Sequence, residues 1–358
     1  MISIDLIAGA RPNFMKISPI IDAITAAAGE GKAITFRLIH TGQHYDKNMS
    51  GSFFEQLGIP EPDVNLGAGG GTQAEQTAAI MIGYEKLLME GEKPDLCLVV
   101  GDVTSTMACT ITAQKLHVKV AHVEAGMPEE INRMVTDSIT NFFFTTSEVA
   151  NESLRKSGVE DERIFYVGNT MIDTLLKHRP RFQKPEVWDK IGLEKGKYIV
   201  MTLHRPSNVD QEEKLKELIQ EIIDHSGGLP LVFPVHPRTK KMLQNLGISH
   251  ERLHMIDPLG YLEFNYLVES AKAVVTDSGG ITEETTVMGI PCMTLRDNTE
   301  RPETITEGTN ELLGTDPQAI KPAMEKLFSD NWKTGKVPYL WDGKTAKRIV
   351  EVLLQKLG

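Results

Sequence analysis

The sequence predicts an α/β protein of two domains, each built on a doubly wound parallel sheet. The chain has 358 residues, 41% of them hydrophobic, which suits two cores of ordinary size better than one. Short apolar, β-branched runs alternate with helical patterns, as they do in parallel βα units. The alternation breaks at a polar stretch, residues 178–181, and then starts again. We therefore expect one domain at residues 1–177 and a second at residues 178–343.

The expected strands are apolar runs, most of which end in a polar residue or a glycine. In the first domain they are residues 2–10, 34–42, 95–102, 118–126, 141–146 and 164–168. In the second they are residues 198–204, 229–236, 253–257, 273–277 and 291–296. Ligands bind beyond the carboxyl ends of the strands in such sheets, so residues that follow a strand are the candidates for a site. Residues 344–357 carry one broad apolar helical face and are expected to pack on a domain surface.

The composition excludes several classes of protein. With 38 basic and 49 acidic side chains, the formal net charge of −11 argues against a general binder of nucleic acid or of membrane surfaces. Cys97, Cys109 and Cys292 are widely spaced in apolar surroundings, which suggests neither a disulfide framework nor a zinc site. A reducing compartment, the cytoplasm, is expected. The first seven residues resemble a strand rather than a signal peptide.

The strongest local motif is a glycine turn at residues 276–280, where an apolar strand gives way to a helix. Gly279 and Gly280 would let phosphate oxygens approach backbone N–H groups at the positive end of the helix dipole. The alternative is an ordinary turn in which Ser278 caps the helix. Glu283 and Glu284 lie near the expected helix start, and one of them could accept hydrogen bonds from ribose hydroxyls.

Basic side chains follow other strands. Arg11 follows the first strand, where a guanidinium can hold phosphate oxygens with two parallel hydrogen bonds. Arg301 lies in a charged loop, residues 296–303, for which the alternative interpretation is a solvated loop. His204 and His236 end two strands of the second sheet and can face a shared ligand. The sequence has no Asp-x-Asp pair of the kind that holds a metal on a diphosphate, so no metal is predicted.

Several carboxylates are expected at one rim of the first domain. Asp102 and Glu124 end two apolar strands, and Glu129 lies at the start of the helix that follows. Clustered like charges raise some carboxyl pKa values, as proton transfer near neutral pH requires. Two structural alternatives stay open: Asp102 as the N-cap of a helix, and an ion pair of Arg133 with Glu129 or Glu130.

Eight segments form an ordered set along nearly the whole chain. They are Gly-Ala-Arg-Pro at 9–12 with a lysine at 16, Thr-Gly-Gln-His at 41–44, Gly-Asp-Val-Thr-Ser-Thr at 101–106, His-Val-Glu-Ala-Gly at 122–126, Pro-Glu-Glu-Ile-Asn-Arg at 128–133, Gly-Asn-Thr-Met-Ile-Asp at 168–173, Thr-Asp-Ser-Gly-Gly-Ile at 276–281 and Glu-Arg-Pro-Glu at 300–303. In this order they resemble the UDP-N-acetylglucosamine 2-epimerase family. The resemblance implies a GT-B-like fold of two Rossmann-type domains that face each other across a cleft. It also implies that a C-terminal helix, residues 344–358, packs back on the first domain.

The resemblance further implies roles for individual residues. The catalytic set would be Asp102, Glu124 and Glu129 as acid and base groups, with His204 beside the nucleotide. The groups that bind the UDP-sugar would be Arg11, Arg133, His236, Ser278, Gly279, Gly280, Glu284 and Arg301. A second UDP-N-acetylglucosamine would bind as an activator at Gln43 and His44, with Lys16 nearby.

The implied reaction is non-hydrolysing and interconverts UDP-N-acetylglucosamine and UDP-N-acetylmannosamine. The C2 proton has no adjacent carbonyl, so its removal has to be coupled to departure of UDP, which gives a 2-acetamidoglucal. UDP then adds back while a proton reaches the opposite face of C2. This route needs an anion clamp and an acid and a base, and no redox cofactor or metal.

Other functions stay open. A hydrolysing relative would release N-acetylmannosamine and UDP, and other members act on modified UDP-sugars such as diacetamido-uronates. Two alternative functions belong to other functional classes: a GT-B glycosyltransferase and an inactive UDP-sugar sensor. Family members are commonly homodimers in cell-surface polysaccharide synthesis.

Family members also carry a longer loop, including an arginine, where here Gly126 is followed directly by Met127 and Pro128. The intact mass of the protein shows whether that loop is absent.

Overall fold

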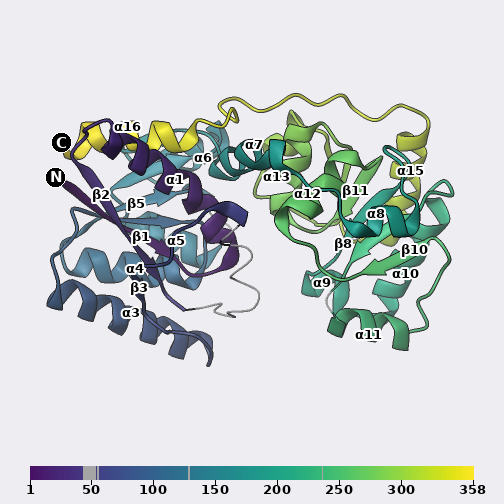
Figure 1. Cartoon of the computed structure of the whole chain (residues 1–358), viewed down its shortest axis with the longest axis horizontal. Helices are drawn as coiled ribbons and strands as arrows, with labels where there is room; N and C mark the ends of the chain where they lie inside the picture. The colour runs from purple at the N-terminus through teal and green to yellow at the C-terminus, as the bar shows by residue number, and fades with distance from the viewer. Residues whose placement is uncertain (43–53, 55, 128–129, 236) are drawn as a thin grey trace. The chain divides into compact units, whose positions relative to one another are not determined.

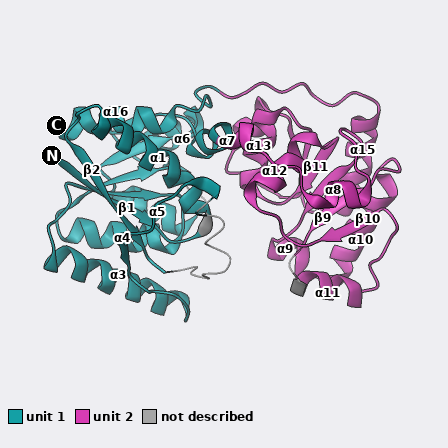
Figure 2. Ribbon diagram, in the orientation of Figure 1, with its two compact units in different colours: residues 1–177, 339–358 teal, residues 178–338 magenta. Residues whose placement is uncertain are grey.

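The chain divides into two compact units, which Figure 2 colours separately. The computed structural model describes residues 1–42, 54, 56–127, 130–235 and 237–358. Unit 1 comprises Met1–Lys177 and Tyr339–Gly358, and unit 2 comprises His178–Pro338. The predicted fold class is confirmed, because each unit contains a wholly parallel sheet with helices around it (Figure 1).

The sheet of unit 1 has seven strands in the order β3-β2-β1-β4-β5-β6-β7. Their bounds are Ile2–Ala8 (β1), Ile34–His40 (β2), Val64–Asn65 (β3), Leu96–Val100 (β4), Lys119–Val123 (β5), Phe142–Thr145 (β6) and Ile164–Tyr166 (β7). The helices are Arg11–Gly29 (α1), Gln73–Glu90 (α3), Thr104–Lys115 (α4), Ile131–Ile139 (α5), Glu148–Lys156 (α6), Thr170–His178 (α7) and Thr345–Leu357 (α16), with a short 3₁₀ turn at Asp161–Arg163.

The sheet of unit 2 has six strands in the order β10-β9-β8-β11-β12-β13. Their bounds are Ile199–Thr202 (β8), Leu231–Pro234 (β9), Leu253–Ile256 (β10), Ala273–Thr276 (β11), Cys292–Thr294 (β12) and Asn310–Leu312 (β13). The helices are Glu186–Ile191 (α8), Pro206–Val209 (α9), Glu212–His225 (α10), Pro237–Asn245 (α11), Tyr261–Ser270 (α12), Gly279–Met288 (α13), Pro302–Thr306 (α14) and Ile320–Phe328 (α15), with 3₁₀ turns at Arg179–Arg181 and Pro317–Ala319.

Both sheets reverse their winding direction at one place. In unit 1 the chain moves outward on one side from β1 and on the other from β4, and these two strands are neighbours. In unit 2 the same relation holds for β8 and β11. The loops that leave such strands diverge to opposite faces of the sheet and open a crevice at its carboxyl edge. The residues after β1, β4, β8 and β11 are therefore the first places to look for a site.

The central strand of unit 1 carries a buried charged residue. Asp5 belongs to the central strand β1 and is 1% exposed. Arg37 of β2 donates Nε and Nη2 to its two oxygens, each at 2.9 Å, and Tyr84 of α3 donates its hydroxyl at 3.0 Å. Burial raises the pKa of Asp5, and these donors oppose that effect. A two-pronged guanidinium contact thus explains why the apolar strand tolerates a carboxylate.

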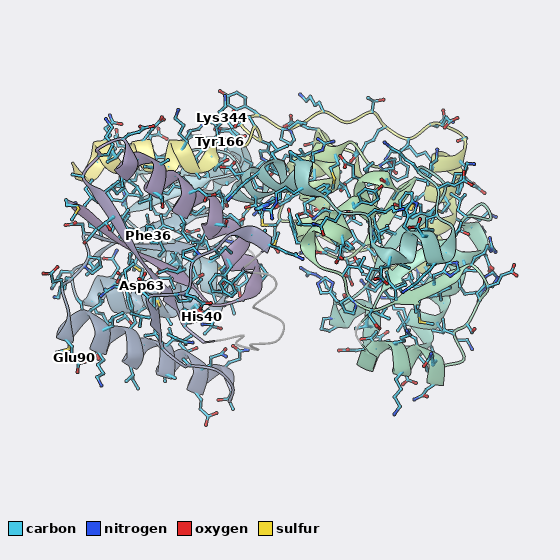
Figure 3. All side chains as sticks on the ribbon, in the orientation of Figure 1. Phe36, His40, Asp63, Glu90, Tyr166 and Lys344 are labelled. Carbon is cyan, nitrogen blue, oxygen red and sulfur yellow. The ribbon has the colours of Figure 1, made fainter. Side chains whose placement is uncertain are left out.

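The C-terminal helix α16 belongs to unit 1 and packs against α1. Asp173 of α7 accepts hydrogen bonds from the backbone N–H groups of the first two residues of α16, at 3.1 and 2.7 Å. Gly168 has a φ of 101°, and a Cβ there would lie 2.2 Å from the carbonyl oxygen of Leu340, so the position requires glycine. The Tyr166 hydroxyl, labelled in Figure 3, donates to the carbonyl of Tyr339. The segment from Gly168 to Asp173 therefore anchors the returning chain.

Within the described residues, no helix is long and apolar enough to cross a membrane.

Candidate functional site

Asn13 joins the two strand ends at the crevice of unit 1. Its Oδ1 accepts the backbone N–H groups of Gly9 at 3.2 Å and Ala10 at 2.8 Å, which lie between β1 and α1. Its Nδ2 donates to the carbonyl of Val100, the last residue of β4, at 3.1 Å. A Cβ at Gly9 would lie 2.0 Å from Oγ of Ser105, so the turn admits only glycine. These contacts fix the direction in which α1 leaves the sheet.

Lys16 and Glu124 form an ion pair in unit 1. Lys16 Nζ lies 2.5 Å from Oε2 of Glu124, and their side chains are 15% and 0% exposed. Glu124 follows β5 with a φ of 69°, a left-handed conformation that is costly for a residue with a side chain. Its backbone N–H donates to the carbonyl of Phe144 at 3.0 Å, which helps to hold this conformation. This strained backbone conformation places the Glu124 carboxylate beside the ammonium of Lys16.

Asp102 is held by α5 on its carboxylate and on its backbone. Arg133 Nη2 donates to Oδ2 of Asp102 at 3.0 Å, and Asn132 Nδ2 donates to its carbonyl at 3.0 Å. Arg133 is 1% exposed. The N-cap position of α4 is Val103, so the alternative in which Asp102 caps that helix is wrong. Glu130 instead caps α5, where its carboxylate accepts the backbone N–H of Arg133 at 3.1 Å.

Among its described residues, unit 1 therefore presents two carboxylates that each contact a cation: Lys16, whose side chain is 15% exposed, and Arg133, which is buried. Both groups lie at loops that leave the carboxyl edge of the sheet, each beside a positive charge. Such pairs keep a carboxylate oriented until a substrate competes for the cation. The arrangement suits a general acid and a general base on one sheet edge.

Asp277 organises the crevice of unit 2. It is fully buried after β11, and it accepts the backbone N–H groups of His204 at 3.0 Å and of Arg205 at 2.9 Å and the amide of Asn208 at 3.1 Å. The ring Nδ1 of His204 lies 2.7 Å from its Oδ1, while the His204 side chain is 62% exposed. Burial alone would raise the pKa of Asp277, but these hydrogen bonds, led by the one from His204, hold it below its usual value. Asp277 thus orients a histidine that faces solvent.

The glycine turn opens α13 as the sequence predicts. Ser278 occupies the N-cap position, but its hydroxyl makes no capping hydrogen bond to this helix, all of whose residues are described. The interpretation of Ser278 as a side-chain cap is therefore wrong. The backbone N–H of Ser278 donates to Oγ1 of Thr276 at 3.0 Å, which turns the chain toward Gly279 and Gly280. A Cβ on Gly279 would lie 3.4 Å from Nη1 of Arg296, so a buried guanidinium lies beside the start of the helix.

The loop after β12 is only partly solvated: Asp297 and Asn298 are exposed, but three of its charged side chains are buried, so its interpretation as a purely solvated loop is wrong. Arg296, Arg301 and Glu303 are 6%, 4% and 6% exposed. Arg301 donates Nε to Glu283 of α13 and Nη1 to the carbonyl of Glu300 at 3.1 Å. Burial raises the pKa of Glu303 to about 7. The loop therefore adds two guanidinium groups to the region around the N-terminus of α13.

Glu284 lies further along α13 and is 4% exposed. The hydroxyl of Tyr261 donates to its Oε1 at 3.0 Å. Burial, aided by the neighbouring carboxylate of Glu283, raises the pKa of Glu284 to about 7. The first turn of α13 holds no acidic residue. A buried carboxyl that titrates near neutral pH suits a ligand with hydroxyl donors.

Some predicted residues lie outside the described part of the chain. These are Gln43, His44, Glu129, His236 and the side chain of Arg11. Among the described residues, no group of three or more His, Cys, Asp and Glu side chains could hold a metal ion. Asn13 and Arg296 carry no separate signal in the sequence, although both lie within or next to segments that stand out for their charge and glycine content.

Comparison with known proteins gives a consistent match over the whole chain. A family model described as UDP-N-acetylglucosamine 2-epimerase matches residues 26–354. The UDP-N-acetylglucosamine 2-epimerase of Methanocaldococcus jannaschii is 40% identical, over 98% of this chain and 98% of that protein. The UDP-2,3-diacetamido-2,3-dideoxy-D-glucuronate 2-epimerase of Pseudomonas aeruginosa is also 40% identical, over 97% of this chain and 98% of that protein. A crystal structure of the M. jannaschii enzyme with UDP-GlcNAc and UDP has a TM-score of 0.85, covering 99% of this chain and 100% of that one.

Proposed function

Because this chain belongs to the UDP-N-acetylglucosamine 2-epimerase family, we propose that it is a non-hydrolysing isomerase that interconverts UDP-GlcNAc and UDP-ManNAc. Its similarity to named 2-epimerases extends over nearly the full length, and its two sheets match the GT-B-like fold of those enzymes. The observation that carries the proposal is the pair of cation-held carboxylates, Glu124 with Lys16 and Asp102 with Arg133.

Unit 2 supplies the groups that we assign to the nucleotide. The N-terminus of α13, with Ser278, Gly279 and Gly280, provides donors for a diphosphate, and such a helix end favours anions. His204 is held by Asp277 and is exposed enough to reach a ligand oxygen. Glu284 can accept hydrogen bonds from the ribose hydroxyls when it is ionised. These groups would bind UDP before cleavage of the C1–O bond and stabilise its additional negative charge afterwards.

Unit 1 supplies the groups that we assign to C2. One carboxylate removes the C2 proton while the C1–O bond breaks and its electron pair leaves with UDP, which gives 2-acetamidoglucal. In the second half-reaction UDP adds to C1, and an acid delivers a proton to the other face of C2. Glu124 and Asp102 are the described candidates for this base and acid, and Glu129 stays a third prediction. The reaction needs two proton-transfer groups because the proton leaves and returns on different faces.

The decisive experiment follows the C2 proton. The purified protein is incubated with UDP-GlcNAc in deuterated buffer, and the products are examined by proton NMR and mass spectrometry. We expect UDP-ManNAc with one deuterium at C2 and no net accumulation of free UDP. Turnover without deuterium at C2 would contradict the proposal. Accumulation of UDP and free ManNAc in equal amounts would identify a hydrolysing enzyme instead.

A second candidate substrate is a modified UDP-sugar. The P. aeruginosa relative named for UDP-2,3-diacetamido-2,3-dideoxy-D-glucuronate is as similar in sequence as the M. jannaschii enzyme. Competing turnover of both UDP-sugars in one reaction gives the ratio of their kcat/KM values directly. Association into a homodimer, and activation by a second UDP-GlcNAc, stay predictions.

A further inference from the structure

A buried histidine of unit 1 uses both of its ring nitrogens. His122 of β5 is completely buried. Its Nε2 lies 2.7 Å from the carbonyl oxygen of Gly101, and because a carbonyl only accepts, Nε2 must donate. Its Nδ1 lies 2.6 Å from Oδ1 of Asp137 on α5. The other oxygen of Asp137 accepts the backbone N–H of Gly126 at 2.8 Å.

The end points of this network flank the two carboxylates of unit 1. Gly101 directly precedes Asp102 on the turn that leaves β4. His122 and Gly126 lie two residues before and two residues after Glu124. Asp137 lies one helical turn beyond Arg133, the residue that donates to Asp102. The three hydrogen bonds therefore connect the turn of Asp102, the turn of Glu124 and the helix that carries Arg133.

We propose that His122 and Asp137 are positioning residues for the proton transfers at C2. The inference rests on the proposed function, because those transfers are what the connected carboxylates would perform. The pair touches neither the sugar nor the nucleotide in this assignment. Its task is to hold two loops from neighbouring strands at one mutual distance, so that Asp102 and Glu124 meet C2 without rearrangement.

A purely structural role explains the pair less well. A buried polar pair seldom stabilises a fold more than well-packed apolar residues of the same volume. What it adds is direction, because each hydrogen bond fixes an angle and a distance that apolar packing leaves looser. Here all three bonds end on the loops or the helix that carry the acid, the base and their guanidinium, rather than on distant parts of the core.

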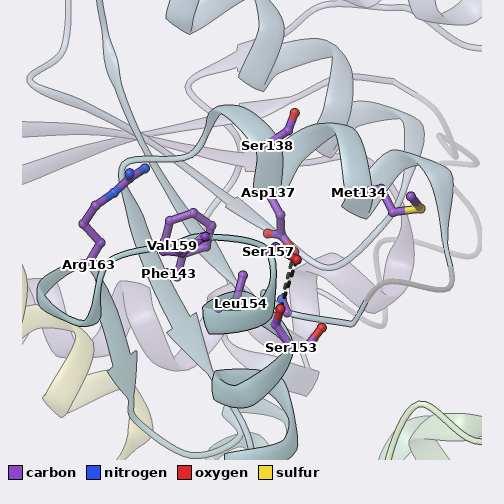
Figure 4. Close-up of a pocket in the computed structure, with 11 residues that line it drawn as sticks. Met134, Asp137, Ser138, Phe143, Ser153, Leu154, Ser157, Val159 and Arg163 are labelled. Carbon is purple, nitrogen blue, oxygen red and sulfur yellow. Dashed lines mark hydrogen bonds between the residues drawn. The ribbon is translucent and has the colours of Figure 1, made fainter.

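Asp137 can be reached from solvent by a small anion. It lies in the wall of a cavity of about 390 Å³ that Gly126, Ser138, Ser153 and Ser157 also line (Figure 4). Its side chain is 15% exposed. A carboxylate removed by mutation can therefore be replaced by formate that diffuses into the cavity. This access makes the role of the carboxylate testable apart from the stability of the fold.

The test compares five variants by C2 deuterium exchange, steady-state kinetics and UDP titration. Asp137→Ala should lower kcat about 100-fold, because loop displacements near 1 Å have effects of this size, while the KM and the UDP affinity stay within about threefold. Formate should restore a saturable part of kcat. Ser138→Ala, a neighbour on α5 in the wall of the same cavity, is the matched control and should keep full activity.

Two further single variants and the double variant that combines them keep the inference testable if Asp137→Ala does not fold. Asp137→Asn can place its oxygen on Gly126 and its amide on Nδ1 of His122, which preserves all three bonds, so activity should stay within about fivefold. His122→Gln would direct an amide oxygen at the Asp137 carboxylate and should lose activity. In His122→Gln/Asp137→Asn donors face acceptors again, and kcat should recover by about tenfold or more.

The outcomes distinguish a failure of the positioning role from a failure of the proposed function. If the wild-type protein exchanges C2 hydrogen while Asp137→Ala folds and keeps its kcat, the positioning role is overturned and the proposed function stands. Loss of UDP affinity in parallel with kcat, with no rescue by formate or by the double variant, also overturns it. If the wild-type protein exchanges C2 hydrogen of no UDP-sugar, the proposed function itself fails.

Discussion

Lys16 Nζ lies 2.5 Å from Oε2 of Glu124, although the two residues are 108 positions apart in the sequence. The contact is made because α1 leaves β1 beside β4, and β5 is the next strand of the sheet. Resemblance alone had placed Lys16 near a binding region for an activator. The structure puts its ammonium on a candidate base, which gives the residue a direct part in the proposed chemistry, and its place near an activator stays a prediction.

Lys16→Met should lower kcat by about 100-fold, because the buried Glu124 carboxylate loses the ammonium that lies 2.5 Å from its Oε2 and holds it in place. The affinity for UDP should change by less than about threefold, since the nucleotide groups are assigned to unit 2. Steady-state kinetics and UDP calorimetry measure both. Lys177→Met removes the exposed ion pair with Asp22 and serves as the control, which should leave kcat unchanged. Equal losses in kcat and UDP affinity for Lys16→Met would contradict this assignment.

UDP affinity should rise with pH up to about 7 and then level off. The pKa of Glu284 is about 7 because burial favours its neutral form, whereas ribose hydroxyls favour the ionised form. Below that pH, binding has to release a proton, which weakens affinity by about tenfold per pH unit. Glu284→Gln should weaken UDP binding at pH 8 and lose this part of the pH dependence, as measured by calorimetry between pH 5.5 and 8.5. The phosphate of UDP titrates in both proteins, so identical pH profiles would refute the prediction.

Glu303→Gln should stabilise the fold at alkaline pH and have little effect in acid. The pKa of Glu303 is raised from 4.5 to about 7 by burial, so the folded chain holds its proton more tightly than the unfolded chain. The stability that results is complete below about pH 4.5 and is lost as the pH rises through 7. The glutamine variant avoids this loss, which is on the order of 3 kcal/mol. Urea unfolding at pH 5 and pH 8 measures the difference, and an equal effect at both pH values would show that Glu303 is not the titrating group.

Asp277→Ala should abolish UDP binding and reduce the free energy of unfolding by about 3–5 kcal/mol, because it strands buried donors from three residues. Those donors are the backbone N–H groups of His204 and Arg205 and the amide of Asn208. His204→Ala serves as the comparison, since it removes only the exposed ring and should cost far less stability. Thermal unfolding and UDP titration distinguish the two variants. A similar loss of stability in both would indicate that Asp277 acts only through the histidine ring.

Sequence patterns located the major strands but not the shortest ones. Every predicted run contains an observed strand, because a short apolar run that ends at a glycine or a polar residue is a strong signal. Val64–Asn65 and Asn310–Leu312 were missed, since two or three residues show no periodicity and pair only because a sheet edge is present. The same limit applies within the site. The sequence places Asp102 at a strand end. Whether its carboxylate accepts a hydrogen bond from Arg133 or caps a helix depends on where α5 lies.

The two crevices are assembled from separate cores, and this has a consequence for how such enzymes diverge. Each group assigned to the nucleotide is supported by neighbours within unit 2, as Asp277 supports His204, and each group assigned to C2 is supported within unit 1, as Lys16 supports Glu124. Substitutions that adapt one half to a new sugar therefore need not disturb the supports of the other half. Related enzymes can then evolve to process a different sugar while their nucleotide-binding residues stay unchanged.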